Sequence, residues 1–169
     1  ARTCPAAPAL VRLLPRLTNV PGIDRIRVSY LQPAEMRPDL VEVIATTPGI
    51  APYFDLSFQH ASPTVLRRMR RFGSRTDFLE LCERIRAHDP EAGIRSNVIV
   101  GFPGGDRGGR RRAGGVPAGR RLDAVGVFGY SDETAPSSGL RRKVAPEEVH
   151  ARVERITALV DELMAQRAR

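Results

Sequence analysis

Residues 94 to 105 read IRSNVIVGFPGG, and this stretch decides the fold. The apolar run from 98 to 100 is typical of a strand buried in the centre of a parallel sheet. The glycine-rich turn from 101 to 105 lets the backbone approach a ligand closely. Parallel strands are joined by crossovers, most of them helical, so a helix is expected next.

The segment that follows does not encode an ordinary helix. Residues 104 to 121, here called the Gly/Arg stretch, read GGDRGGRRRAGGVPAGRR and hold seven glycines and six arginines without apolar periodicity. Six arginines against Asp106 give +5 of the formal charge of +8, which leaves +3 for the rest of the chain. An excess of positive charge normally indicates a nucleic-acid partner, but here most of the excess lies in this one segment.

Length and composition predict one globular domain, because 169 residues with 41% apolar content are enough to form a core. Cys4 and Cys82 lack metal-ligand spacing, and Cys82 shares a helical stripe with Phe78 and Ile85, which predicts a buried thiol. No apolar run approaches the roughly 18 residues of a membrane span, and no signal peptide opens the chain, so we expect a cytoplasmic protein. The missing initiator Met indicates an incomplete parent sequence.

The periodicity predicts strands alternating with helices. The expected strands are 25 to 30, 53 to 58, 94 to 100 and 123 to 130. The expected helices are 7 to 19, 39 to 47, one from a Ser62 hydroxyl cap and Pro63 to Gly73, 76 to 88, and one starting at Pro146. This order predicts an α/β fold with a parallel sheet and right-handed crossovers. A complete barrel takes about 250 residues, so the chain is either a small open sheet or a piece of a barrel.

Polar or glycine residues follow each expected strand. They are Tyr30 and Gln32, then Gln59, His60 and Ser62, then Gly101, and finally Tyr130 and Ser131. Because ligands collect at the carboxyl ends of parallel strands, these residues predict one site at one edge of the sheet.

Two of the candidate residues have alternative interpretations. His60 is either a general base or ligand-orienting donor, or a residue that hydrogen-bonds the adjacent turn. Asn97 is a polar residue among Val and Ile on the central strand, so its amide contacts either a ligand or a partner inside the sheet.

His88 and His150 are expected to be solvated or to complement a helix dipole. The basic run 67 to 71 binds an acidic partner or, as we favour, forms a solvated helix face.

Four stretches in order resemble consecutive blocks of one family. They are RVSYLQPAEM (27 to 36), FDLSFQHASPTVLRRMRRFGS (54 to 74), IRSNVIVGFPG (94 to 104) and LDAVGVFGYSDE (122 to 133). They resemble the radical S-adenosylmethionine methylthiotransferases, in the RimO-like branch that modifies an aspartate of a small-subunit ribosomal protein. The resemblance covers roughly residues 20 to 104 and 122 to 165.

The resemblance implies a fold and its cofactors. Residues 1 to 144 would form the later strands and helices of an incomplete, partial (β/α) radical-SAM barrel, with 104 to 121 as an aberrant segment. Residues 145 to 169 would form a trailing amphipathic helix leading toward a C-terminal β-barrel domain. The family's CxxxCxxC loop, which holds a 4Fe-4S cluster, and a domain with a second cluster would lie upstream. No metal ligand and no catalytic residue is therefore expected in this chain, which alone would be inactive.

The resemblance also implies roles for the residues at the strand ends. Residues on the substrate side would be Tyr30, Gln32 and His60. Residues that bind S-adenosylmethionine would be Gln59, Ser62, Asn97, Ile99, Gly101, Tyr130 and Ser131. Within this set, Asn97, Ile99 and Gly101 would border the methionine and adenine portions, and Tyr130 and Ser131 would close the adenine edge. The implied partner is a small-subunit ribosomal protein, with no membrane and no DNA.

The family departs from this sequence after residue 104, where it continues with Glu-Thr-Glu-Glu-Asp and an amphipathic helix. Residues 105 to 109 read Gly-Asp-Arg-Gly-Gly, which the codons GGA-GAC-CGA-GGA-GGA can encode. Regrouped one base later, these codons would encode Glu-Thr-Glu-Glu and then Asp or Glu. Our hypothesis is that two compensating frame errors replaced one crossover helix, which resequencing of the gene would decide.

Three alternative functions remain open from the sequence. The sister branch of the family methylthiolates a tRNA adenosine. The Gly/Arg stretch resembles RNA-binding segments, although it lacks interleaved aromatic residues that stack on bases. An unrelated barrel enzyme that holds a phosphate at 101 to 105 would need no iron.

Overall fold

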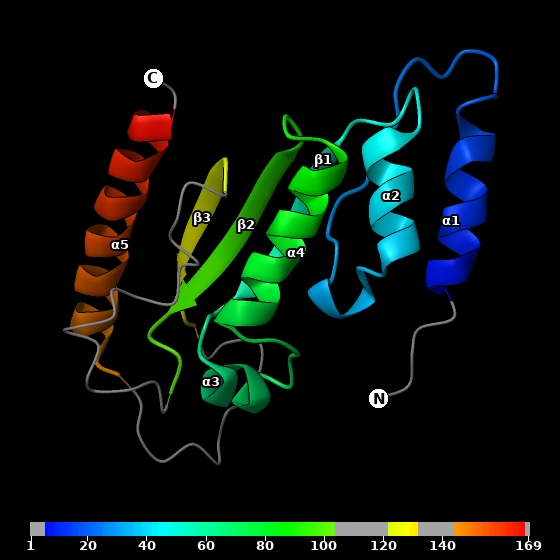
Figure 1. Cartoon of the computed structure of the whole chain (residues 1–169). Coiled ribbons are helices and arrows are strands. Elements are labelled where there is room, and N and C mark those ends of the chain that lie inside the picture. The colour runs from blue at the N-terminus through cyan, green and yellow to red at the C-terminus, as the bar shows by residue number, and fades with distance from the viewer. Residues whose placement is uncertain (1–5, 104–121, 132–143, 168–169) are drawn as a thin grey trace.

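The computed structural model describes residues 6 to 103, 122 to 131 and 144 to 167, as one α/β arrangement around a small sheet (Figure 1). The elements in chain order are α1 (Ala6–Leu17), the 3-10 turn η1 (Pro33–Glu35), α2 (Pro38–Thr46), β1 (Tyr53–Gln59), α3 (Pro63–Arg68), α4 (Arg75–His88), β2 (Gly93–Val100), β3 (Ala124–Gly129) and α5 (Pro146–Arg167). The Gly/Arg stretch lies outside the described residues.

The described sheet has three strands in the order β1-β2-β3, and both pairings are parallel. Phe54 lies opposite Ile94, and Val100 lies opposite Gly129. The expected parallel α/β class is therefore confirmed, and the carboxyl ends of all three strands meet at the same edge.

The expected strand at 25 to 30 is wrong. This segment runs beside β1 but forms two isolated bridges in place of a strand. Ile26 bridges to Ile50, just before β1, and Leu31 bridges to Leu56 within β1. Between them Tyr30 adopts φ 59, a left-handed conformation that bends the chain out of the extended form. Four expected strands therefore become three in the described part of the chain.

The expected helices are present, with shifted ends. Helix α4 begins after Ser74, whose hydroxyl accepts the Asp77 N–H at 3.3 Å. Helix α3 ends at Arg68, well before Gly73, because Arg70 takes φ 55 and the Arg71 N–H bonds back to the Leu66 carbonyl at 2.8 Å. This is a Schellman ending, in which Arg70 occupies the position that usually holds glycine.

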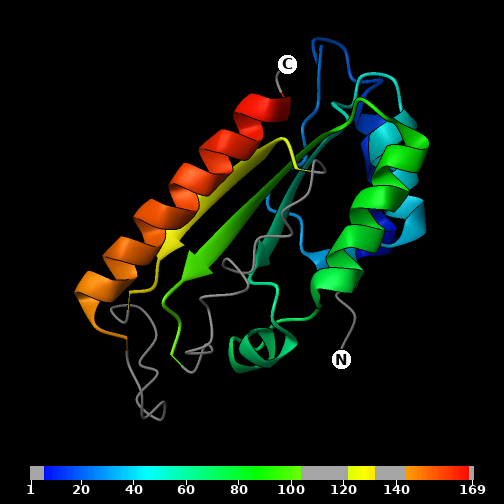
Figure 2. The ribbon, with the colours of Figure 1, turned by 60° about the vertical axis from the view of Figure 1, so that its left-hand side comes forward.

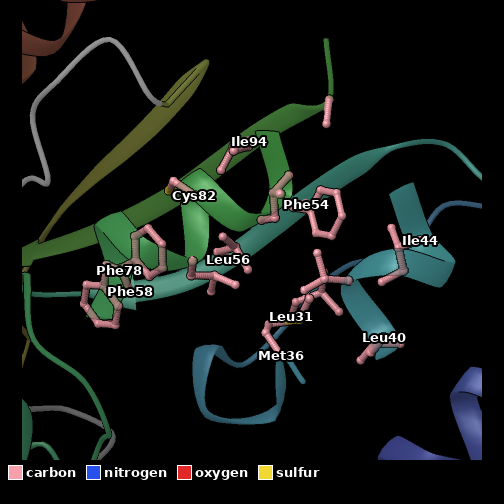
Figure 3. Packing of buried hydrophobic residues seen from close by; sticks show 14 of the residues in the cluster. Leu31, Met36, Leu40, Ile44, Phe54, Leu56, Phe58, Phe78, Cys82 and Ile94 are labelled. Carbon is pink, nitrogen blue, oxygen red and sulfur yellow. The ribbon is translucent and has the colours of Figure 1, made fainter. Parts of the chain in front are cut away.

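The main core lies between β1 and the helices that cover it (Figure 3). Phe54, Leu56 and Phe58 point from β1 toward α2 and α4, and Phe58 stacks on Phe78 with ring centroids 4.1 Å apart. Cys82 of α4 is 1% exposed, which confirms the expected buried thiol. Full burial of such side chains contributes about 1.5 to 3 kcal/mol each, so this cluster anchors the sheet.

A second core lies under α5, which runs alongside β3 in both views (Figures 1 and 2). Val98 and Val100 of β2 pack against Ile156 and Val160 of α5. Residues at alternate positions of a strand share one side, so the face of β2 that includes Val98 is the face that α5 covers. The opposite face carries Asn97 and other half-buried residues.

An ion pair ties the amino-terminal edge of the sheet together. Arg86 of α4 donates to Asp123, just before β3, at 2.8 Å, and also to the Ala92 carbonyl. The same Asp123 oxygen accepts the Ile94 N–H at 2.6 Å. One carboxylate therefore links α4, β2 and the start of β3 on the far side of the sheet from the candidate site.

Candidate functional site

The carboxyl edge of the sheet brings together residues that lie far apart in the sequence. Gln59 ends β1, Gly101 follows β2, and Tyr130 follows β3. The Tyr130 N–H donates to the Val100 carbonyl at 2.8 Å, which keeps the ends of β2 and β3 side by side. The shared edge expected from the sequence is therefore present.

The loop with the substrate-side candidates lies beside β1. Leu31 bridges to Leu56, and its N–H donates to the Asp55 carbonyl at 2.8 Å. Tyr30 is 80% exposed, so its ring is free of the core. Gln32 is also exposed, but its Oε1 accepts a hydrogen bond from Arg71 at 2.9 Å. The loop is thus attached to β1 on one side and to the end of α3 on the other.

Strand β1 has a bulge just before the site. Leu56 pairs with Ser96, but the next partners are Gln59 and Val98, so Ser57 and Phe58 together face Asn97. We refer to residues 57 to 59 as the bulge. Gln59 takes φ 66, which turns the chain at the end of the strand. Bulges of this kind redirect side chains next to functional sites.

His60 is held as a neutral acceptor by the turn that follows β1. Its Nδ1 accepts the Ser62 N–H at 2.9 Å, and burial lowers the pKa of the imidazole from its ordinary value. With Nδ1 accepting, the ring proton sits on Nε2. The interpretation of His60 as a turn-stabilising residue is therefore realised, and its Nε2–H remains as a donor group on the other side of the ring.

The expected hydroxyl cap at Ser62 is wrong. Ser62 occupies the N-cap position of α3, yet its side chain makes no capping hydrogen bond, and its backbone N–H donates to His60 Nδ1. Helix α3 therefore begins with Pro63 at its first position, which needs no N–H partner.

Asn97 carries an unsatisfied polar atom. Its Oδ1 is buried and has no hydrogen-bond partner, so the sheet-internal bond considered from the sequence is absent for this atom. Gly126 lies opposite on β3, and a Cβ there would come within 2.7 Å of Oδ1 and 2.9 Å of the Phe128 ring. A buried acceptor without a donor costs about 1 to 3 kcal/mol, so this face of the sheet carries an unsatisfied polar group.

Phe128 is a site residue that sequence reasoning missed. It pairs with Ile99 across the sheet, on the same face as Asn97, and it is 52% exposed. The signal was available, because residues 124, 126 and 128 alternate along β3 and must share one side of the sheet. An exposed phenyl ring beside Ile99 gives this face an apolar surface.

Gly101 has a structural reason to be glycine. Its φ is 84, and a Cβ at this position would lie 2.6 Å from a methyl group of Val149 in α5. The close approach expected from the sequence is thus made by a helix. Next to it, a cavity of about 750 Å³ lies between the ends of β2 and β3 and the first turns of α5. Tyr130 lines this cavity and meets the Phe102 ring edge-on at 5.0 Å.

The remaining titratable candidates lie at the surface. His150 has a side chain that is 76% exposed and lies 3.3 Å from Glu154 on α5, as expected for a solvated histidine. Arg67 is exposed on α3, in agreement with the favoured interpretation of the basic run, whereas Arg71 bonds to Gln32 and to the Ser57 carbonyl.

Across residues 6 to 103, 122 to 131 and 144 to 167, no cluster of three or more His, Cys, Asp or Glu side chains is arranged to hold a metal ion. No helix in the same ranges has the length and apolar character needed to cross a membrane.

Sequence comparison finds close relatives among curated proteins, although no family model matches the chain. The chain is 62% identical over 161 residues to the ribosomal protein uS12 methylthiotransferase RimO of Saccharopolyspora erythraea, which covers 95% of the chain and 33% of the relative. It is 61% identical to the protein of the same name from Salinispora tropica, over 95% of the chain and 32% of the relative. The corresponding protein of Kineococcus radiotolerans is 56% identical, over 95% and 33%. The chain thus spans about a third of the length of the relatives that it matches.

Proposed function

We propose that this chain, which belongs to the family of RimO-like ribosomal protein uS12 methylthiotransferases, forms part of the S-adenosylmethionine-binding module of such an enzyme. The observation that carries the proposal is the identity of 62% over 95% of the chain. The relatives described above are all named for the ribosomal-protein reaction, which favours that substrate over a tRNA adenosine.

The residues of the sheet edge fit a cofactor with both polar and apolar parts. Asn97 lies on the half-buried face of β2, and its amide can donate to or accept from the polar groups of S-adenosylmethionine. Ile99 and Phe128 offer an apolar surface on the same face for the flat adenine ring. Gln59, Ser62, Gly101, Tyr130 and Ser131 complete the proposed cofactor-binding set around this edge.

The chain's own residues would bind and orient the cofactor. When bound, S-adenosylmethionine supplies the methyl group and, together with a reduced 4Fe-4S cluster, the radical that abstracts hydrogen from the substrate. The three-cysteine cluster motif of the family needs one cysteine more than the two that this chain has, so we assign the cluster ligands to other residues of the enzyme. His60, neutral and carrying its proton on Nε2, would present a hydrogen-bond donor on the substrate side, with Tyr30 and Gln32 beside it.

In this proposal the described sheet with α1 to α4 belongs to a partial radical-SAM barrel within residues 1 to 144. Helix α5, within residues 145 to 169, leads toward a β-barrel domain of the whole enzyme. The enzyme would act in the cytoplasm on an aspartate of the small-subunit ribosomal protein, and this chain without its cluster-binding part would be inactive.

The cofactor assignment is tested by titrating S-adenosylmethionine into the 169-residue chain and following backbone amide signals by NMR. We expect saturable shifts at the sheet edge, and an Asn97→Ala variant that binds about tenfold more weakly, as loss of one hydrogen bond to a charged group gives. Asn19→Ala, at an exposed asparagine in the turn that follows α1, is the matched control and should bind like the parent chain. Absence of saturable binding by the unmodified chain would contradict the assignment.

The reaction is tested in a chimera. The matching third of the Saccharopolyspora erythraea protein is replaced by this chain, and the mass of uS12 is measured after incubation with the reconstituted enzyme. The proposal predicts the mass of an added methylthio group on an aspartate. Modification of a tRNA adenosine by the chimera, with uS12 unchanged, would instead assign the sister activity.

A further inference from the structure

Three backbone N–H groups at the bulge and just after it donate to acceptors outside the pairing of β1 with β2. The Ser57 N–H donates to the Leu31 carbonyl at 3.0 Å. The Phe58 N–H donates to the Ser96 hydroxyl at 3.3 Å in the buried interior of the sheet. The His60 N–H donates to the Phe58 carbonyl at 2.9 Å. Each of these bonds fixes the bulge, because buried backbone groups must find partners.

The Ser57 carbonyl is bound by a side chain from outside the sheet. Arg71 Nη1 donates to this carbonyl at 3.3 Å and to Gln32 Oε1 at 2.9 Å. One guanidinium therefore joins the bulge to the loop that carries the substrate-side candidates. Arg71 is half-buried in this position, and burial lowers the pKa of its guanidinium from the ordinary value.

The Schellman ending of α3 places Arg71 next to the bulge. The Arg71 N–H is bonded to Leu66, and Val65 and Leu66 are buried under the sheet edge. The helix end is therefore anchored in the core, and the left-handed turn at Arg70 sends the chain back toward β1. Arg67 and Arg68, one turn earlier, are exposed on the helix.

We propose that Arg71 is a positioning residue, which sets the geometry of Gln59 and His60 by holding the bulge to the Gln32 loop. A guanidinium is suited to this task because its planar group presents several donors in fixed directions, so it can bridge two acceptors that belong to different segments. The inference rests on the proposed function, since it assigns to Arg71 the alignment of the edge at which the cofactor and substrate would meet.

The test uses three variants of the 169-residue chain. Arg71→Gln removes the charge and the bridging geometry. Arg71→Lys keeps the charge but replaces the planar guanidinium, whose Nη1 makes both bonds, with a tetrahedral ammonium. Arg67→Gln changes a neighbouring exposed arginine and is the matched control. For each variant, amide hydrogen exchange is measured residue by residue, together with the affinity for S-adenosylmethionine.

We expect Arg71→Gln to accelerate exchange selectively at Ser57, Phe58 and His60 and to weaken S-adenosylmethionine binding about tenfold, the effect of losing one charge-assisted hydrogen bond. Arg71→Lys should recover part of both effects, and Arg67→Gln should change neither. A purely structural role would instead accelerate exchange by one common factor across the whole sheet, and that result would overturn the proposal.

The two proposals fail in different ways. If the Arg71→Gln chain binds S-adenosylmethionine as tightly as the unmodified chain, the positioning role is wrong while the cofactor assignment stands. If the unmodified chain does not bind S-adenosylmethionine, the cofactor assignment is wrong for this chain. The exchange pattern then decides the positioning role alone, since selective loss at the bulge supports it and uniform loss overturns it.

Discussion

His60 links the geometry of one turn to the pH at which the chain is stable. Its Nδ1 accepts the Ser62 N–H, an arrangement that needs the neutral ring, and burial lowers its pKa below the ordinary value of about 6.5. At pH values between the pKa of His60 in the folded chain and its pKa in the unfolded chain, His60 binds a proton in the unfolded chain but not in the folded chain. The contribution of His60 to stability is therefore fully present above the unfolded pKa and is lost as the pH falls toward the folded pKa.

A substitution at this residue tests the assignment. In His60→Asn, the amide oxygen replaces Nδ1 as acceptor but cannot titrate, so the fall in stability below about pH 6.5 should become shallower. The measurement is the free energy of unfolding by urea at a series of pH values. Ser62→Ala, which keeps the backbone N–H that His60 accepts, is the control and should leave the slope unchanged. An equal slope in the His60 variant and the unmodified chain would disprove the role of this ring.

At the residue scale, the sequence predicted which residues share the edge of the sheet but not the hydrogen bonds that they make. The position of Gln59, Gly101 and Tyr130 at one edge followed from strand ends alone, since parallel strands end on one side. The unsatisfied oxygen of Asn97 did not, because whether an amide finds a partner depends on the residue opposite, here Gly126. Arg71 was hidden within a basic run, and only the turn at Arg70 distinguishes it from its exposed neighbours.

At the scale of elements, the packing of α5 on the sheet depends on one glycine. Gly101→Ala would place a Cβ 2.6 Å from Val149 and would force an alanine into a backbone conformation that favours glycine. We expect the variant to lose about 2 to 4 kcal/mol of unfolding free energy, the combined effect of a left-handed alanine and an overpacked contact. Thermal and urea unfolding followed by circular dichroism measure this loss.

Two further variants separate the causes. Gly129→Ala faces the same valine at 3.2 Å with an ordinary backbone conformation, so it should lose much less stability. Adding Val149→Ala to Gly101→Ala should restore the part due to the contact and leave the part due to the backbone. No recovery in the double variant would show that contact with α5 is not what limits this position.

Elements with strong apolar periodicity were predictable from the sequence, and the failures have local causes. Helix α4 and strand β2 differ from expectation by one residue at their starts, because each buries a regular stripe of apolar side chains. The segment 25 to 30 has the alternation of a strand, but Tyr30 breaks the extended conformation, which alternation does not report. The bulge at 57 to 59 likewise leaves the apolar pattern of β1 unchanged.

At the scale of the whole molecule, Asp123 connects parts that the chain joins only through long segments. It receives hydrogen bonds from Arg86 of α4 and from the Ile94 N–H of β2, and it immediately precedes β3. Asp123→Asn keeps an acceptor but removes the charge, so we expect a loss of about 1 to 2 kcal/mol, discounted for the partial exposure of both side chains. The check is urea unfolding, with Asp161→Asn, an exposed position on α5, as control.

The order of the sheet also bears on how the molecule behaves in concentrated solution. In the described sheet, β3 is outermost, and an outermost strand usually invites a strand of another molecule to pair with it, the first step of aggregation. Strand β3 is only six residues long and includes Gly126 and Gly129, which have no side chain to pack against an added strand. Because β3 is short and has two glycines, it is a poor template for pairing with a strand of another molecule.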